Sequence, residues 1–122
     1  MSVGPGGRAE TGQSAEELVA AHLGDDGYEI VARNVRVGRL ELDIIARRGR
    51  LLVICEVRSR TTRAFGSPAL TIDQKKIARI RRATAGWLRT NRPGTTELRF
   101  DAAAVTFDAD GSHELMYYER AF

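Results

Sequence analysis

Four charged residues lie in two neighbouring apolar segments of this 122-residue sequence. Glu41 and Asp43 are two positions apart in the first segment, and Glu56 and Arg58 are two positions apart in the second. Residues two apart in a strand project to the same face, and a turn at Gly49 would place Asp43 and Glu56 nearly opposite each other. Two carboxylates at that distance repel each other unless a cation lies between them or one is protonated. Their oxygen ligands predict a metal site for Mg²⁺ or Mn²⁺ at Asp43 and Glu56.

A simpler alternative is that these acids face solvent and pair with nearby arginines, as most charged residues in strands do. Apart from the acids, however, the segments LELDIIA and LLVICEV consist of apolar residues. The acids would then lie at the edge of a buried layer, where the loss of hydration is costly and a function is the usual reason for a carboxylate. The setting favours a functional site over a solvated face.

Periodicity and turn residues indicate the elements that must position these side chains. Ser14 and Glu17 form a capping box, which predicts a first helix from about residue 15 to Gly24. A second and longer helix is expected over residues 71–91. Apolar runs and alternating patterns between turn signals predict four strands, at 28–37, 40–46, 51–60 and 97–107.

This order of elements predicts an α/β fold with an αβββαβ core. The second helix makes the connection between the third and fourth strands long enough for parallel pairing, so the central sheet should be mixed and flanked by helices. Residues 1–12 are rich in glycine and have little to bury, which indicates a flexible leader. Residues 13–122 are expected to form a single domain, with a tail at 108–122 that has no assigned structure.

Composition excludes several classes of function. Cys55 is the only cysteine, which excludes an intramolecular disulfide and a zinc site of several cysteines. No apolar run is long enough to cross a bilayer, and the first residues lack the pattern of a secretory signal. We therefore expect a cytoplasmic protein with no membrane partner.

Basic residues are concentrated in the second expected helix, although the formal net charge of the chain is only +3. Starting at Lys75, basic residues recur at spacings of four, three and seven, and no acid lies between Gln74 and Arg92. Like charges so spaced repel each other, which favours contact with a phosphate backbone, here expected to be DNA, over a merely solvated helix face. The candidate nucleic-acid-binding residues are Lys75, Lys76, Arg79, Arg82, Arg89 and, in the preceding segment, Arg60.

Six short segments carry a resemblance to a known family. In chain order they are GQSAEELVAAHL, GYEIVARNVR, ELDIIA, LLVICEVRSR, FGSPALTIDQKKIARIRRA and LRFDAAAV. Together they span about residues 12–107 and resemble the UPF0102 (YraN) family. The resemblance implies a restriction-endonuclease-like fold related to archaeal Holliday-junction resolvases, and a metal-dependent endonuclease acting on structured or branched DNA.

The resemblance also assigns individual positions. It makes Glu16 the acid of the first helix and Lys76 the basic residue of the second, and the strand acids are Glu41, Asp43, Glu56 and Asp101. For Glu16, a favourable acid at a helix N-terminus is an equal alternative. Asp101, next to Phe100 and an alanine run, is interpreted instead as a structural acid paired with an arginine.

Two positions depart from the family pattern. Leu40 replaces a glycine before Glu41, and Arg58 replaces the lysine of the E-x-K signature. An arginine can stabilise the transition state of phosphodiester hydrolysis, but it does not give up its proton and cannot serve as a base. Two alternatives to a nuclease therefore stay open, a catalytically inactive nucleic-acid- or partner-binding module and a structural interaction domain. The sequence sets no oligomeric state, and a homodimer is also an open alternative.

Overall fold

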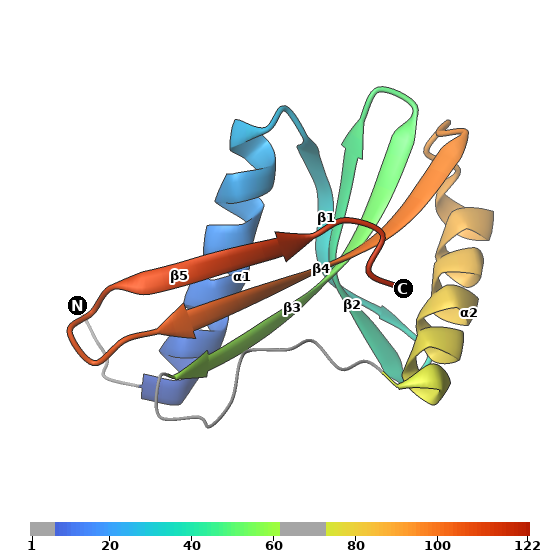
Figure 1. Ribbon diagram of the computed structural model, residues 1–122. Coiled ribbons are helices and arrows are strands. Elements are labelled where there is room, and N and C mark those ends of the chain that lie inside the picture. Colours follow the sequence, from blue (N-terminus) through green and yellow to red (C-terminus); the bar gives the residue numbers. More distant parts are fainter. Residues whose placement is uncertain (1–6, 62–72) are drawn as a thin grey trace.

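A computed structural model describes residues 7–61 and 73–122 (Figure 1). The described part of the chain forms one five-stranded sheet and two helices. In chain order the elements are α1 (Gly7–Asp25), β1 (Glu29–Val37), β2 (Leu40–Arg48), β3 (Leu51–Thr61), α2 (Gln74–Asn91), β4 (Glu97–Phe107) and β5 (His113–Tyr118).

The strands lie in the sheet in the order β1-β2-β3-β4-β5. The pair β3–β4 is parallel, and the other three pairs are antiparallel. The parallel pair follows from the connection through α2, because a chain cannot return to the start of a parallel strand through a tight turn. The predicted α/β architecture, an αβββαβ core with a mixed central sheet flanked by helices, is confirmed.

The start of the first helix was predicted wrongly. α1 begins at Gly7, so Ser14 lies well inside the helix and cannot cap it, and residues 7–12 of the expected leader are helical. Arg8, Ala9 and Glu10 are good or moderate helix formers, and a serine inside a helix costs only a few tenths of a kcal/mol, roughly 0.5. Nothing in the local pattern therefore forces the helix to start at the capping box.

The second helix begins at Gln74, and the first residues of its expected span, 71 and 72, lie outside the described residues. Asp73 is its N-cap, and the Asp73 carboxylate accepts a hydrogen bond from the Lys76 backbone N–H at 2.8 Å. No helix in the parts of the chain that the structure describes is long and apolar enough to cross a bilayer.

The tail that had no assigned structure contains β5, which pairs with β4 at the edge of the sheet. Three of its residues, His113, Glu114 and Met116, are exposed, and none of its six residues is fully buried. Short, half-exposed edge strands carry little apolar periodicity, which explains why the sequence pattern did not predict this one.

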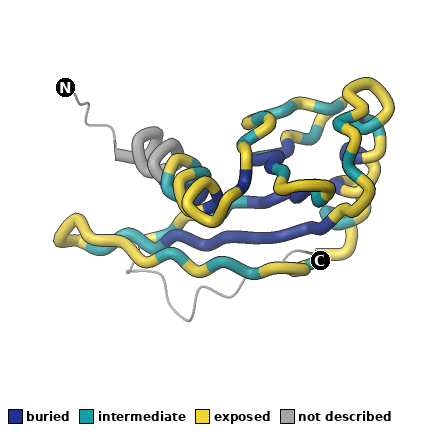
Figure 2. The backbone as a smooth tube through the Cα atoms, turned by 90° about the horizontal axis from the view of Figure 1, so that it is seen from above, coloured by how far each residue is buried: buried dark blue, intermediate teal, exposed yellow. Residues whose placement is uncertain are grey.

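The core has two halves, one on each face of the sheet, as the buried central strands in Figure 2 show. α1 covers the first half with Val19 and Leu23, and α2 covers the second with Ile80 and Trp87. Gly86 allows α2 to approach β1 closely, because a Cβ atom at that position would lie 3.4 Å from Val37 Cγ1. The two helices thus pack on opposite faces of the sheet, where α1 contacts β2 and β3 and α2 contacts β2.

Asp101 lies on β4 opposite Cys55 of β3 and is the centre of a buried polar network. Its carboxylate is fully buried and accepts two hydrogen bonds from Arg99, both at 2.9 Å. It also accepts one from the Tyr117 hydroxyl at 2.6 Å and one from the Arg120 backbone N–H at 3.0 Å. Arg99 in turn donates to the Tyr28 hydroxyl at 2.8 Å. The pairing of Asp101 with an arginine, expected from the sequence, is confirmed, and the network joins β4 to β5 and the C-terminal residues.

Candidate active site and basic groove

β2 and β3 pair over only part of their length. Their ladder runs from Arg48 opposite Leu51 to Ile44 opposite Cys55, and beyond it the two strands diverge (Figure 1). We call this divergence the fork. Asp43 and Glu56 are the next residues after the last pair, so both lie at the fork, adjacent across the hairpin as the sequence predicted.

At the fork, the side chain of Asp43 accepts a hydrogen bond from the backbone of β3, in place of a backbone carbonyl of β2. Its Oδ2 accepts a hydrogen bond from the Val57 backbone N–H at 2.9 Å. Opposite Asp43 in β1, Asn34 has a left-handed backbone with φ of 53°. Leu42 packs in the core half under α2 and Ile44 in the half under α1, although regular alternation would place both on one face. The alternation therefore breaks at Asp43.

From regular alternation, the sequence predicted that Glu41 and Asp43 share a face of β2. Because the alternation breaks at Asp43, a shared face no longer follows. Glu41 is exposed, yet its charge still raises the pKa of both Asp43 and Glu56. Glu41 therefore lies near the acid pair without being buried beside it.

Burial dominates the electrostatics of the acid pair. It raises the pKa of Asp43 from 3.8 to about 6, an effect that the Val57 N–H opposes and the charge of Glu16 reinforces. Burial likewise raises the pKa of Glu56 from 4.5 to about 7, and the charge of Asp43 adds to the shift while Lys76 opposes it. Without a cation, this pair resists full ionisation near neutral pH.

Glu56 has an incomplete set of partners. It is only 4% exposed, and its Oε1 lies 3.9 Å from the Lys76 Nζ, too far for a hydrogen bond. Its Oε2 is buried and has no hydrogen-bond partner among the described residues. A buried carboxylate oxygen without a partner is costly, and a bound cation would remove that cost.

The residues at the fork fit a divalent cation with few protein ligands. Within the described residues, no group of three or more histidine, cysteine, aspartate or glutamate side chains is arranged to hold a metal ion. Asp43 and Glu56 would therefore supply two carboxylates, and water and substrate phosphate the remaining ligands. Mg²⁺ is commonly bound in this way, through one or two carboxylates.

The other predicted catalytic residues surround the fork from different elements. Glu16 projects from α1, where its Oε1 lies 3.5 Å from Arg33 Nη2 and its charge acts on Asp43. Because α1 begins at Gly7, Glu16 is in the third turn and is not an N-terminal acid. Arg58 is half-buried on β3, two residues beyond Glu56. That Arg58 contacts the scissile phosphate and stabilises its charge in the transition state stays a prediction.

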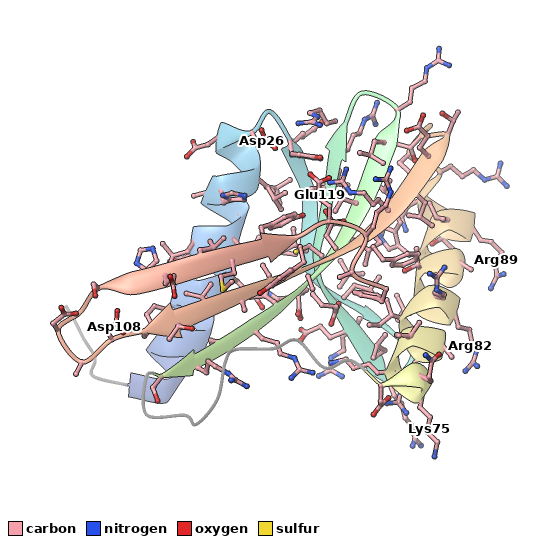
Figure 3. The ribbon with its side chains drawn as sticks, viewed as in Figure 1. Asp26, Lys75, Arg82, Arg89, Asp108 and Glu119 are labelled. Atoms are coloured by element: carbon pink, nitrogen blue, oxygen red, sulfur yellow. The ribbon has the colours of Figure 1, made fainter. Side chains whose placement is uncertain are left out.

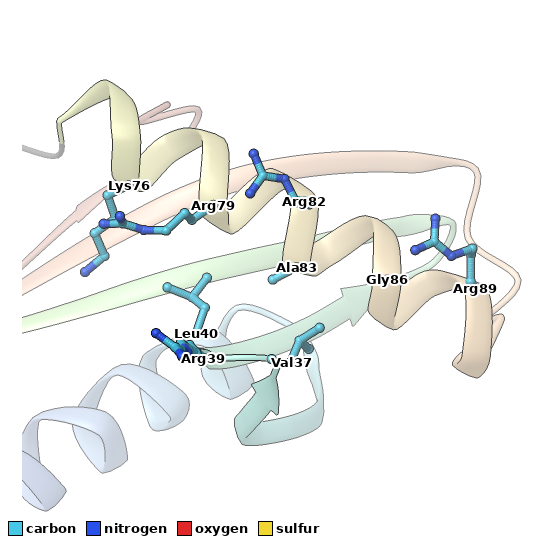
Figure 4. Close-up of a pocket in the computed structure, with 10 residues that line it drawn as sticks. Val37, Arg39, Leu40, Lys76, Arg79, Arg82, Ala83, Gly86 and Arg89 are labelled. Atoms are coloured by element: carbon cyan, nitrogen blue, oxygen red, sulfur yellow. The ribbon is translucent and has the colours of Figure 1, made fainter.

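The predicted basic residues of α2 are exposed, apart from the half-buried Lys76, and all of them except Lys75 also line a groove. Figure 3 shows Lys75, Arg82 and Arg89 projecting from α2 into solvent. Between α2 and the β1–β2 turn lies a groove of about 850 Å³, which we call the basic groove (Figure 4). The cations that line it are Arg39, Lys76, Arg79, Arg82 and Arg89. Lys75 does not line it, and the predicted binding residue Arg60 lies instead at the end of β3, half-buried.

Two residues have a position that the sequence pattern did not predict. Lys76 was expected only as a basic helix residue, whereas the structure places it both in the basic groove and beside Glu56. Arg39 was not selected at all, although the dipeptide Gly38-Arg39 between two strands is a turn signal that would have exposed it. Both positions depend on how α2 docks on the hairpin.

Because the pKa of Glu56 is raised, the unfolding free energy of the protein should depend on pH. A carboxyl whose folded-state pKa is raised is stabilising below its unfolded pKa, and this contribution is lost as pH rises through the folded value. In the presence of a chelator, Glu56→Gln should therefore match the wild type near pH 4.5 and exceed it above pH 7 by roughly 2–3 kcal/mol in unfolding free energy. Urea unfolding across this pH range measures the difference, with the exposed Glu114→Gln as control. A difference that is the same at every pH would contradict the assignment.

Comparison with known proteins places the chain in a family. The model of the uncharacterised protein family UPF0102 matches residues 15–105. A UPF0102 protein of Sorangium cellulosum is 43% identical over 118 residues, which cover 94% of this chain and 82% of that protein. One from Anaeromyxobacter sp. is 38% identical over 112 residues, covering 92% and 84% of the two chains.

Among solved structures, this chain is similar to SfsA of Pyrococcus furiosus in complex with Ca²⁺. The identity is 17% and the TM-score is 0.40, and the match covers 91% of this chain and 63% of that chain. The family model and the curated relatives, which extend over nearly all the described elements, establish that this chain belongs to the UPF0102 family.

Proposed function

We propose that this protein binds DNA in the cytoplasm and hydrolyses phosphodiester bonds at the fork with Mg²⁺ or Mn²⁺. One observation carries the proposal: the half-buried Asp43 and the buried Glu56, which has an oxygen without a partner among the described residues, lie next to Lys76 of a groove lined by cations. The carboxylates suit a divalent cation, and the groove suits the polyanion on which such a cation would act.

The chain's own residues can divide the work of hydrolysis. Asp43 and Glu56 would hold the cation, and the Val57 backbone N–H, which donates to Asp43 Oδ2, fixes the orientation of that carboxylate. When bound, a divalent cation polarises the phosphate and makes nearby water more acidic. Arg58 contacts the scissile phosphate and stabilises the charge that develops on it, while Glu16 and Glu41 hold water molecules around the fork.

Lys76 compensates in part for the signature lysine that Arg58 replaces. Lys76 lines the groove with its Nζ 3.9 Å from Glu56 Oε1, and an ammonium there can orient the attacking water. Lys76→Met should lower the cleavage rate constant about 10- to 100-fold, as loss of a residue that supports metal ligands does. Single-turnover kinetics measure the effect, and Lys76→Arg should restore part of the rate. A change in substrate affinity alone would contradict this role.

The proposal is tested with pure protein, Mn²⁺ and branched, flapped and duplex DNA. The wild type should cleave at least one of these substrates, cleavage should stop on addition of a chelator, and Asp43→Ala should be inactive. Equal cleavage by both proteins would indicate a contaminating nuclease, and no cleavage by either would contradict the catalytic proposal.

A second candidate is a nucleic-acid-binding module without catalysis. The replacement of the signature lysine by Arg58 favours it, and the basic groove does not depend on a working acid pair. This candidate predicts salt-sensitive DNA binding that survives Asp43→Ala and falls in the charge-reversal variant Arg79→Glu/Arg82→Glu.

A further inference from the structure

We infer that the basic groove seats the phosphodiester backbone of a single nucleic-acid strand, and that Arg39 at the β1–β2 turn holds it from the side opposite α2. The inference rests on the proposed nucleic-acid binding and deepens it, because it names what part of the ligand is bound and where. It does not depend on catalysis at the fork.

The two walls of the groove come from elements far apart in the sequence. Figure 4 shows Arg39 and Leu40 beneath the N-terminal half of α2, and Val37 facing Gly86. Arg39 follows Gly38, whose φ of 63° forms the tight turn that presents the arginine at the hairpin tip. A strand lying between the hairpin and α2 would therefore meet positive charge on both sides.

The groove arginines have no acidic partner within the described residues. Lys76 approaches Glu56, but Arg39, Arg79, Arg82 and Arg89 make no ion pair or side-chain hydrogen bond there. Several like charges held together in one groove repel each other, and an external polyanion would relieve that repulsion. Bound phosphates would also release counterions, which is the main driving force of backbone binding.

The length of the charged wall suits several consecutive phosphates. From Lys76 to Arg89 the helix rises about 20 Å, at 1.5 Å per residue. The phosphates of one strand lie farther apart along the backbone than the roughly 3.4 Å axial rise of B-form DNA, so this wall spans several phosphates but fewer than about six. A free phosphate or a mononucleotide would use only a small part of it.

The remaining lining limits what can be recognised. Besides the cations, the groove is lined by Val37, Gly38, Leu40, Ala83 and Gly86. None of these side chains can hydrogen-bond to a base edge, and none is aromatic and able to stack on a base. The apolar lining thus adds no base-reading group, and we assign the lining arginines to phosphate and sugar, so the bound backbone can belong to a single strand or to one strand of a duplex.

Lys76 connects the groove to the fork. It lines the groove and lies 3.9 Å from Glu56, so a backbone that follows the α2 wall toward its N-terminal end arrives at the acid pair. The groove thus sets the path by which a phosphodiester would reach Asp43 and Glu56.

The test compares Arg39→Ala with Arg50→Ala, since both remove one exposed arginine from a hairpin turn and only Arg39 lines the groove. Fluorescence anisotropy measures binding of a fluorescein-labelled oligothymidylate of about 20 nucleotides, and of a duplex of the same length, between about 50 and 200 mM salt with a chelator. Arg39→Ala should reduce the slope of log K against log salt by about 0.7 for the single strand or about 0.9 for the duplex. Arg50→Ala should leave the slope unchanged.

Each outcome decides the inference. Equal slopes for the two variants, or no binding of either probe by the wild type, would overturn it. The probe whose slope falls in Arg39→Ala but not in Arg50→Ala identifies whether a single strand or a duplex supplies the backbone. The binding test contains a chelator and so does not depend on a metal. A negative cleavage assay would therefore not contradict binding in the basic groove, and a negative binding test would not contradict the metal site at the fork.

Discussion

Asp43→Asn is expected to lower Mn²⁺-dependent cleavage by about 100- to 1,000-fold, the cost of removing one principal charge-stabilising group from an active site. The amide oxygen of asparagine can still accept the Val57 N–H, which is 2.9 Å from Asp43 Oδ2, so the fork should keep its shape. The negative charge that holds the cation is lost, however. Single-turnover cleavage and calorimetric titration with Mn²⁺ measure the two effects, and both should fall together.

A matched control separates this result from a general loss of charge. Asp26→Asn also removes one carboxylate, but Asp26 is 61% exposed and pairs only with Arg48 at 3.4 Å. It should leave cleavage and Mn²⁺ affinity unchanged. DNA affinity in the presence of a chelator should stay the same or rise in Asp43→Asn, since a negative charge near the phosphate path is removed. Undiminished Mn²⁺ affinity in Asp43→Asn would rule out Asp43 as a ligand.

Asp101→Ala is expected to lower the unfolding free energy by about 3–5 kcal/mol, the usual cost of removing one member of a buried ion pair. Asp101 is fully buried and accepts hydrogen bonds from Arg99, Tyr117 and the Arg120 backbone. Its loss would leave the Arg99 guanidinium, 9% exposed, without its principal partner. The hydrogen bond to Asp101 is the main cause that raises the pKa of Arg99, and the guanidinium stays charged even without that partner because arginine does not lose its proton in proteins.

Urea unfolding measures this loss, with Asp26→Ala as the exposed comparison. A surface ion pair contributes about 1 kcal/mol or less, so Asp26→Ala should change stability little. Asp101→Asn should fall between the two, because an amide keeps part of the hydrogen bonding without the charge. A loss for Asp101→Ala no larger than for Asp26→Ala would mean that the network does not hold the C-terminal residues in place.

Local patterns were sufficient to predict most of the fold. The turns at Gly38 and Gly49 and the apolar runs between them predicted the three-stranded meander, and the helical spacing of Ile80 and Trp87 predicted α2. These signals depend on neighbours in the chain, which the sequence displays directly. The adjacency of Asp43 and Glu56 followed in the same way, because a tight turn sets the register of a hairpin.

Features of the fold that depend on contacts between distant residues left only a weak pattern in the sequence, or none. The capping box at Ser14 was a valid local pattern, but α1 extends past it to Gly7, through a segment that contains the poor helix former Gly12. β5 is stabilised by pairing with β4 at an edge, and its own residues carry little periodicity. Neither outcome can be read from a window of neighbouring residues.

By itself, the sequence determined the α/β order of elements, the hairpin that carries the two acids and the basic character of α2. Only the tertiary structure decided how these parts meet. The divergence of β2 from β3 leaves an oxygen of Glu56 without a described partner, and the docking of α2 brings Lys76 to Glu56 and places Arg39 across the groove. The physical reason is that packing of a helix on a sheet joins residues many positions apart, at distances that no local spacing encodes. The site is therefore a product of the fork and the helix that lies against it.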